Sequence, residues 1–106
     1  MGYISWVLVQ TTEIYRDWIN RLKEKTVRAR IQVRFDRLVH GNPGQHRHLS
    51  DGVSELKIDL GPGYRVYYTE RAGVLIILLA GGDKSSQPQD IKTAIALAKN
   101  LQEPMP

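Results

Sequence analysis

Residues 52–87 constrain the fold most strongly, because they have the pattern of three consecutive strands joined by short turns. Val53–Leu60 alternates apolar and polar side chains, as a half-buried strand does. Gly61–Gly63 has the composition of a turn, and Tyr64–Thr69 follows as the second strand. After another turn, Val74–Ala80 is a continuous apolar run, which is typical of a strand buried on both faces. This segment therefore predicts the greater part of a small, mainly antiparallel sheet.

The residues before this segment predict one strand and two helices. Trp6–Gln10 is a short run of strand-forming residues, and Thr12 is a candidate N-cap for the helix that follows. Apolar residues recur at helical spacing in two successive stretches. They are Ile14, Trp18, Ile19 and Leu22 in the first helix and Val27, Ile31, Phe35 and Leu38 in the second. Because the joint between them is short, we expect a helical hairpin that packs against the sheet.

The remaining segments complete a single domain. Gly41–Asp51 is polar, and we interpret it as a long loop between the second helix and the strands. Ile91–Leu101 carries apolar residues at helical spacing and predicts a closing helix that packs back on the sheet. The predicted order is β-α-α-β-β-β-α, an α+β fold that occupies residues 1–106 as one domain.

Composition excludes several classes of function. The chain has no cysteine, which excludes disulfides and thiolate-bound metals and favours a cytoplasmic location. The longest apolar run, Val74–Ala80, is too short to cross a bilayer, so we expect no membrane association. The formal net charge is +4, from fifteen Lys and Arg against eleven Asp and Glu. This excess makes nucleic acid or an acidic protein a plausible partner.

Three basic residues lie at the faces and ends of adjacent predicted strands, where they could grip a phosphodiester. Lys57 and Arg65 lie on strand faces, and Lys84 follows the apolar strand. A guanidinium can bind two phosphate oxygens and stabilise the charge that develops in a transition state. The segment shows no obvious acid pair or metal-ligand cluster, so we expect no cofactor. This hypothesis requires the three cations to meet in one shallow pocket.

Three sequence motifs in this order resemble a known family. They are GVSEL from Gly52, GPGYRVYY from Gly61 and LLAGGDKSSQ from Leu78. Together with the element order, they resemble the RelE/HigB/ParE superfamily of bacterial toxin–antitoxin toxins, and within it the group of addiction-module killer proteins. The resemblance implies a small toxin that cleaves mRNA, typically on the ribosome, as a metal-independent endoribonuclease that inhibits translation. It also implies a cognate antitoxin, commonly a helix-turn-helix protein, that holds the toxin inactive in a hetero-oligomer.

The resemblance also suggests roles for individual residues. Arg65 matches the arginine after the Gly-Tyr turn that holds the scissile phosphate in RNA-cleaving relatives. Lys57 lies on the strand that supplies the base for the ribose 2′-hydroxyl, with Glu55 on the same face as the alternative base. Lys84 lies where relatives carry a basic residue that supports the leaving 5′-oxygen.

Further candidate RNA contacts lie on the second strand and in the polar loop. Tyr67 shares a strand face with Arg65, and His46, Arg47 and His48 are consecutive in the loop. Histidines can serve as acid and base near neutral pH, but two histidines without a third ligand do not predict a metal site. The second helix also carries three arginines on one flank, which are either solvated or in contact with ribosomal RNA or an acidic antitoxin segment. These are Arg30, Arg34 and Arg37.

Two other functions stay open. The superfamily includes members that poison DNA gyrase, so the chain could inhibit growth without cleaving RNA and use the same sheet as a binding face. A basic, non-catalytic RNA-binding domain would also fit the charge.

Overall fold

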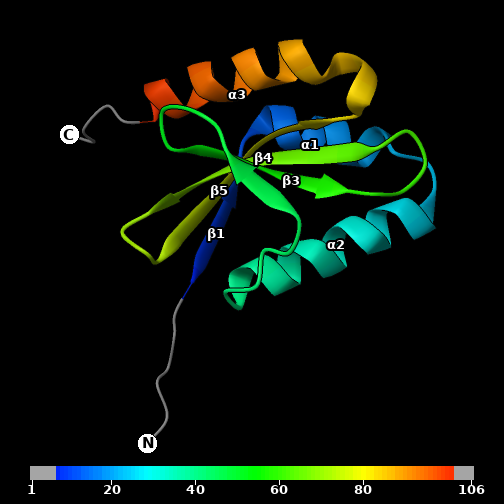
Figure 1. Cartoon of the computed structure of the whole chain (residues 1–106), viewed down its shortest axis with the longest axis horizontal. Helices are drawn as coiled ribbons and strands as arrows, with labels where there is room; N and C mark the ends of the chain where they lie inside the picture. The colour runs from blue at the N-terminus through cyan, green and yellow to red at the C-terminus, as the bar shows by residue number, and fades with distance from the viewer. Residues whose placement is uncertain (1–6, 102–106) are drawn as a thin grey trace, which may run out of the picture.

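The computed structural model describes residues 7–101 as a five-stranded sheet with helices on both faces (Figure 1). Along the chain, β1 (Leu8–Thr11), α1 (Glu13–Arg21) and α2 (Lys25–Val39) precede β2 (His46–His48), β3 (Val53–Ile58), β4 (Tyr64–Arg71) and β5 (Leu75–Gly82). A short 3₁₀ turn, η1 (Lys84–Ser86), then leads into α3 (Gln87–Asn100). The α+β class is confirmed. Trp6, the predicted start of the first strand, lies outside the described residues.

The sheet is mixed, with strand order β1-β5-β4-β3-β2. β1 runs parallel to β5, and the other neighbours are antiparallel, as the short turns between β3, β4 and β5 require. β2 was not predicted. It forms within the polar stretch that we interpreted as a loop, where it pairs with β3 as an edge strand.

The two faces of the sheet have separate cores. On one face, α1 and α2 pack on β3, β4 and β5 around a cluster that includes Ile31, Leu56, Tyr68 and Leu78. On the other, α3 packs on a smaller cluster, and Figure 1 shows α3 and α2 on opposite sides of the sheet. In the first helix the buried residue is Tyr15, whereas Ile14, which we had placed on the apolar side, is 45% exposed. No helix within residues 7–101 is long and apolar enough to span a bilayer.

Thr12 fastens the start of α1 to the sheet. Its hydroxyl oxygen accepts a hydrogen bond from the Tyr15 backbone N–H at 3.0 Å, which confirms the predicted N-cap. The same hydroxyl donates to the carbonyl of Leu79 at 2.6 Å. Leu79 lies at an irregularity in the β4–β5 ladder, where Tyr67 faces Ala80 but Tyr68 faces Leu78. The Thr12 hydroxyl therefore also supplies a hydrogen-bond donor to a carbonyl at the irregularity in strand pairing.

Two glycines at the end of β5 allow helices to approach from both sides. A Cβ on Gly81 would lie 2.2 Å from the Trp18 ring of α1, and a Cβ on Gly82 would lie 1.8 Å from Oδ2 of Asp90 in α3. At Gly81 the clash is with the packed ring of Trp18, so this close packing requires glycine, whereas a Cβ on Gly82 would displace the side-chain ends of Asp90 and Ser86. This Gly-Gly pair is part of one motif that carried the family resemblance, and its role is structural.

Candidate functional site

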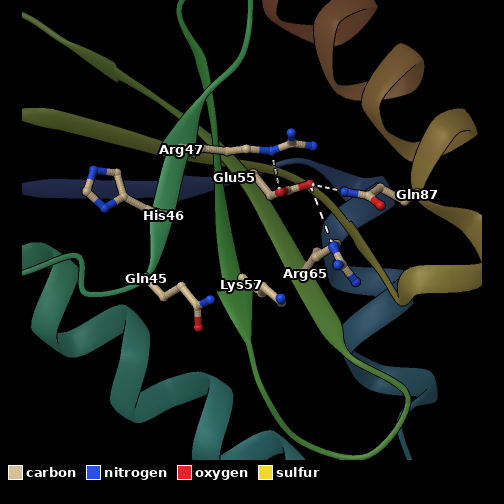
Figure 2. Close-up of a pocket in the computed structure, with 7 residues that line it drawn as sticks. All are labelled: Gln45, His46, Arg47, Glu55, Lys57, Arg65 and Gln87. Atoms are coloured by element: carbon tan, nitrogen blue, oxygen red, sulfur yellow. Dashed lines mark hydrogen bonds and ion pairs between the residues drawn. The ribbon is translucent and has the colours of Figure 1, made fainter.

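A pocket of about 380 Å³ opens over β2, β3 and β4, next to the first turn of α3 (Figure 2). This volume is within the range of small-ligand sites. Its lining residues come from four elements and the loop before β2. They are Gln45, His46, Arg47, Glu55, Lys57, Arg65 and Gln87.

Strand register brings the charged residues of this pocket together. Lys57 is directly opposite Arg65 in the β3–β4 ladder, and Arg47 is opposite Glu55 in the β2–β3 ladder. Because side chains alternate between faces along a strand, Glu55 and Lys57 share one face of β3. The same alternation puts their apolar neighbours, Leu56 among them, in the core under α1 and α2.

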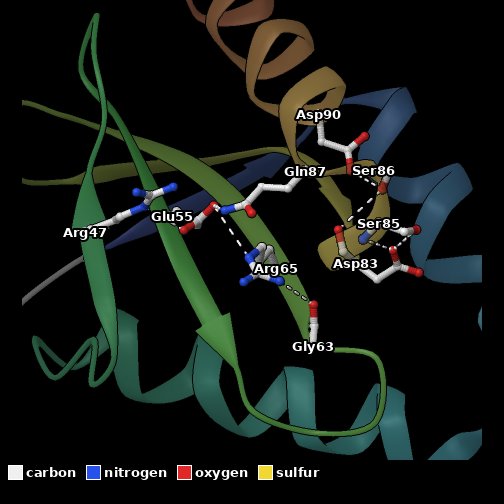
Figure 3. A network of polar contacts seen from close by, with 9 residues as sticks. All are labelled: Arg47, Glu55, Gly63, Arg65, Asp83, Ser85, Ser86, Gln87 and Asp90. Atoms are coloured by element: carbon white, nitrogen blue, oxygen red, sulfur yellow. Dashed lines mark hydrogen bonds and ion pairs between the residues drawn. The ribbon is translucent and has the colours of Figure 1, made fainter.

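Glu55 is the centre of the polar network in the pocket (Figure 3). The residue is only 3% exposed. Its Oε1 accepts a hydrogen bond from Nε of Arg47 at 2.9 Å, and its Oε2 accepts one from Nε2 of Gln87 at 2.9 Å. Nε of Arg65 lies 3.8 Å from Oε2 as an ion pair. A buried carboxylate requires such partners, and here they tie β2, β4 and α3 to β3.

Arg65 lies at the floor of the pocket and is 6% exposed. Its Nη1 donates a hydrogen bond to the carbonyl of Gly63 at 2.7 Å. Gly63 adopts φ +79°, and a Cβ there would lie 3.3 Å from Nη1, so glycine both allows the turn and leaves room for the guanidinium. Nε of Arg65 is buried and, among the described residues, has no hydrogen-bond partner. The hydrogen bond to Gly63 and the ion pair with Glu55 therefore hold the guanidinium in place.

Lys57 is fixed through its backbone, while its side chain reaches the pocket. Its N–H donates to the carbonyl of Gln45 at 3.0 Å, and its own carbonyl accepts a hydrogen bond from Nη1 of Arg34 at 2.6 Å. The ion pairs found within residues 7–101 join Glu55 to Arg47 and to Arg65, so the Lys57 ammonium has no carboxylate partner there.

The pocket carries an excess of positive charge. Arg47, Lys57 and Arg65 contribute three cations, against the single carboxylate of Glu55. Such an excess favours an anion with several oxygens, such as a phosphodiester. Within the described part of the chain, no group of three or more His, Asp or Glu side chains is arranged to hold a metal ion.

Lys84 does not line this pocket. It is the first residue of η1 and is exposed, and its backbone N–H points to the carbonyl of Pro62 at 3.4 Å. It lies across Gly63 from Arg65, because a Cβ on Gly63 would be 3.7 Å from the Cβ of Lys84. Lys57 and Arg65 thus meet in one pocket, whereas the expectation that Lys84 joins them there is wrong: it lies on the other side of Gly63, outside the lining. Asp83 directly precedes Lys84, and hydrogen bonds from the hydroxyl and backbone N–H of Ser85 lower the pKa of this carboxylate.

The side chains of the three loop candidates point in different directions, because these residues form strand β2. Arg47 points to Glu55, whereas the ring of His46 points away from the charged cluster in Figure 2. Nδ1 of His46 lies 2.7 Å from the carbonyl of Gly44, and Nδ1 of His48 lies 2.8 Å from the hydroxyl of Ser54. We expected all three to contact RNA from one loop; His46 and Arg47 line this pocket, whereas His48 lies outside its lining.

Tyr67 corrects another expectation. It lies on the same face as Arg65, but it is 0% exposed and belongs to the cluster under α3. A residue without exposed surface does not contact RNA in this conformation. Burial, followed by the nearby charge of Glu55, raises the pKa of Tyr67 well above its ordinary value. Two pocket residues, Gln45 and Gln87, were not identified from the sequence, because glutamines in a loop and at a helix start carry no distinctive pattern.

Comparisons with known proteins agree with this architecture. Residues 17–103 match the model of a family described as "Phage derived protein Gp49-like (DUF891)". A protein of Haemophilus influenzae, described as uncharacterized, is 46% identical over 95 residues, which cover 90% of this chain and 96% of the relative. The fold is similar to that of the E. coli toxin RelE, solved as a double mutant in the free state, with a TM-score of 0.68. That match covers 86% of this chain and 96% of the other at 16% identity, so it is a likeness of fold.

Proposed function

The chain belongs to the Gp49-like family, a family of RelE-like toxins, and from this premise we propose that it cleaves mRNA on the ribosome as a metal-independent endoribonuclease. In this proposal the chain is the toxin of a toxin–antitoxin pair and acts in the cytoplasm. The observation that supports cleavage is the pocket in which Lys57 and Arg65, paired across two strands, lie beside the buried carboxylate of Glu55.

The proposed reaction is transesterification within the RNA. The ribose 2′-oxygen attacks the adjacent phosphorus, the bond from phosphorus to the 5′-oxygen breaks, and the products carry a 2′,3′-cyclic phosphate and a 5′-hydroxyl. Arg65 would bind the phosphate oxygens from the floor of the pocket and stabilise the charge that develops on them. Its fixed position favours this role, because a donor that is already oriented costs little reorganisation during the reaction.

The contacts around Glu55 favour Lys57 over Glu55 as the base. Both oxygens of the carboxylate already accept hydrogen bonds, and the residue is almost fully buried. A carboxylate engaged in this way has little capacity to take a proton from RNA. We therefore assign Glu55 to positioning the guanidiniums of Arg47 and Arg65. Lys57 would accept the proton of the 2′-hydroxyl through its neutral amine form and become an ammonium. Lys84, beside the pocket, would support the leaving 5′-oxygen.

Family membership implies an antitoxin partner, and we propose a helix-turn-helix protein from the neighbouring gene that forms a hetero-oligomer with this chain. An acidic segment of such a partner would cover the positively charged pocket. Co-purification with the product of the adjacent reading frame tests this point. Absence of any complex between the two purified proteins would contradict it.

The decisive experiment for cleavage uses purified ribosomes programmed with a defined mRNA. We expect the protein to generate new 5′-hydroxyl ends within the reading frame, also in the presence of EDTA at a concentration that leaves the ribosomes intact. Lys57→Met should abolish these ends, and Lys92→Met, at an exposed lysine of α3, is the matched control. Intact mRNA together with inhibited DNA gyrase would reject the nuclease and support the gyrase-poison alternative.

A further inference from the structure

The positive charge of this chain is concentrated on one helix. α2 carries five basic residues and one acidic residue, a formal charge of +4 that equals the net charge of the whole chain. The rest of the chain contains ten basic and ten acidic residues and is formally neutral. The basic residues of α2 are Lys25, Arg28, Arg30, Arg34 and Arg37, and its acidic residue is Asp36.

One flank of α2 forms a second hollow next to the cleavage pocket, which we call the arginine groove. It has a volume of about 420 Å³, and α2 contributes Arg30, Val33, Arg34 and Arg37 to its lining. Its opposite wall comes from Gly44, Gln45, Ile58 and Asp59. Gln45 lines both this groove and the cleavage pocket, so the two hollows adjoin.

The arginines of the groove are not neutralised by carboxylates. Within residues 7–101, none of them lies within ion-pair distance of an Asp or Glu, although Asp59 contributes to the same groove. Arg34 uses its guanidinium internally, donating to the carbonyls of Lys57, Pro43 and Gln45. Burial and then the charge of Arg37 lower the pKa of Arg34, which places two like charges close together. An anion in the groove would relieve this repulsion.

We propose that the arginine groove is a second phosphate subsite, which binds the single-stranded RNA chain where it leaves the cleavage pocket. The inference rests on the proposed function for the identity of the anion. A strand with its scissile phosphate on Arg65 has further phosphates at regular spacing on either side, and the adjoining groove offers the exposed guanidiniums of Arg30 and Arg37. The exposed side chain of Val33 provides an apolar contact between them.

The test measures RNA binding separately from cleavage. The wild-type protein is titrated with a short, fluorescent single-stranded RNA in which every ribose is 2′-O-methylated, because this substitution removes the attacking hydroxyl. The variant is Arg30→Gln/Arg37→Gln. Its matched control is Lys92→Gln/Lys99→Gln, which removes the same charge from exposed positions of α3. Thermal unfolding of all three proteins confirms that they are folded.

We expect the groove variant to bind RNA about tenfold more weakly at low salt, and the control to bind almost as tightly as wild type. The plot of log affinity against log salt concentration should lose about 1.4 of its slope in the groove variant, because each phosphate contact to a single strand contributes about 0.7. The same affinity and slope in groove variant and control would overturn the proposal, and so would a wild type that binds no RNA.

Two outcomes separate this inference from the proposed function. A groove variant that shows the expected loss, in a protein that cleaves no mRNA, keeps the subsite and rejects the nuclease. If the wild type cleaves mRNA and the groove variant binds RNA as tightly as wild type, the subsite is rejected and the nuclease is kept. A loss of antitoxin affinity with RNA binding unchanged would assign the groove to an acidic protein segment and overturn the proposal.

Discussion

The proposed cleavage pocket, which holds Arg47, Lys57 and Arg65, and the arginine groove each contain three basic side chains, but they differ in what surrounds that charge. In the pocket, the buried Glu55 fixes Arg47 and Arg65 by direct contacts. In the groove, Arg34 is held by backbone carbonyls, and no carboxylate within residues 7–101 pairs with Arg30 or Arg37.

Guanidinium groups therefore serve two purposes in the two regions, chemistry in one and affinity for an anion in the other. A guanidinium held by a buried carboxylate loses part of its attraction for an anion but gains a defined position, which favours chemistry. An exposed guanidinium keeps its attraction and lacks a defined position, which favours affinity that depends on salt. We therefore expect substitutions in the pocket to lower the rate of cleavage and substitutions in the groove to lower RNA affinity.

The largest effect should come from Arg65→Gln. This change removes the fixed cation at the floor of the pocket, and loss of one oriented donor to a developing anion commonly slows a reaction about 100-fold to 1,000-fold. RNA affinity should fall much less, because the groove is unchanged. Single-turnover cleavage and RNA titration on the same preparation measure both quantities. A folded variant with the wild-type cleavage rate would break the comparison.

Glu55→Gln sharpens the comparison, because it removes the ordering charge and leaves the cations. The amide that replaces one carboxylate oxygen would face donors from Gln87 and Arg65, so the network loosens. We expect cleavage to fall about tenfold, the lower end expected for losing a hydrogen bond to a charged group. RNA binding should be unchanged or tighter, because the pocket then has three cations and no anion.

The pH dependence of Glu55→Gln distinguishes positioning from catalysis by the carboxylate. If Glu55 only positions the guanidiniums, the cleavage rate of the variant keeps the shape of the wild-type pH profile at a lower level. Loss of the acidic limb of the profile in the variant would identify Glu55 as the base and would contradict our assignment of Lys57.

Arg34→Gln should affect both regions, because Arg34 connects them. Its guanidinium holds the carbonyls of Pro43, Gln45 and Lys57 at 2.6–3.0 Å. Removing it leaves these carbonyls with fewer donors and should lower the free energy of unfolding by about 1–3 kcal/mol. Cleavage and RNA affinity should each fall several-fold. Urea unfolding and the two functional assays check this, and unchanged stability would show that solvent replaces the guanidinium without cost.

The sequence predicted the pocket well where strand periodicity decides the outcome. Alternation put Glu55, Lys57 and Arg65 on one face, and short turns between the strands made them neighbours. Periodicity did not predict β2, because His46–His48 has no apolar alternation and becomes a strand through pairing with β3. The same pairing places Arg47 next to Glu55. The periodicity of residues 52–87 did not indicate this contact, because Arg47 lies outside that segment.

The second limit of prediction from sequence was the degree of burial, which differs between residues on the same face of the sheet. Tyr67 and Arg65 share a face, but α3 covers Tyr67 completely, and strand alternation does not indicate how far a helix extends over a sheet. The position of Lys84 was also not predictable from strand alternation, because the chain turns into η1 after β5 and Lys84 lies outside the pocket lining. The arginine groove depends on α2 lying against the loop at Gly44 and Gln45, which helical periodicity does not specify.

The smallest effect should come from Tyr67→Phe, which tests whether burial excludes this residue from the site. The Tyr67 hydroxyl is buried and, within residues 7–101, has no hydrogen-bond partner. Removing it should leave cleavage and RNA affinity unchanged and should alter the free energy of unfolding at neutral pH by no more than about 1 kcal/mol, in the stabilising direction. A large loss of RNA affinity would return Tyr67 to the site and show that α3 moves when RNA binds.

Alkaline pH should separate Tyr67→Phe from wild type more clearly. The raised pKa of Tyr67 means that the folded state keeps the phenolic proton after the unfolded state, which titrates near pH 10, has lost it. This tyrosine therefore contributes stability below about pH 10 that is lost as pH rises, at about 1.4 kcal/mol per pH unit. Burial also raises the pKa of Tyr15, to about 12, and the pKa of Tyr68, so wild type loses stability through all three tyrosines. The variant lacks one of these contributions, and urea unfolding above pH 10 should show a shallower decline; an identical decline would mean that the Tyr67 hydroxyl ionises as readily in the folded chain as in the unfolded one.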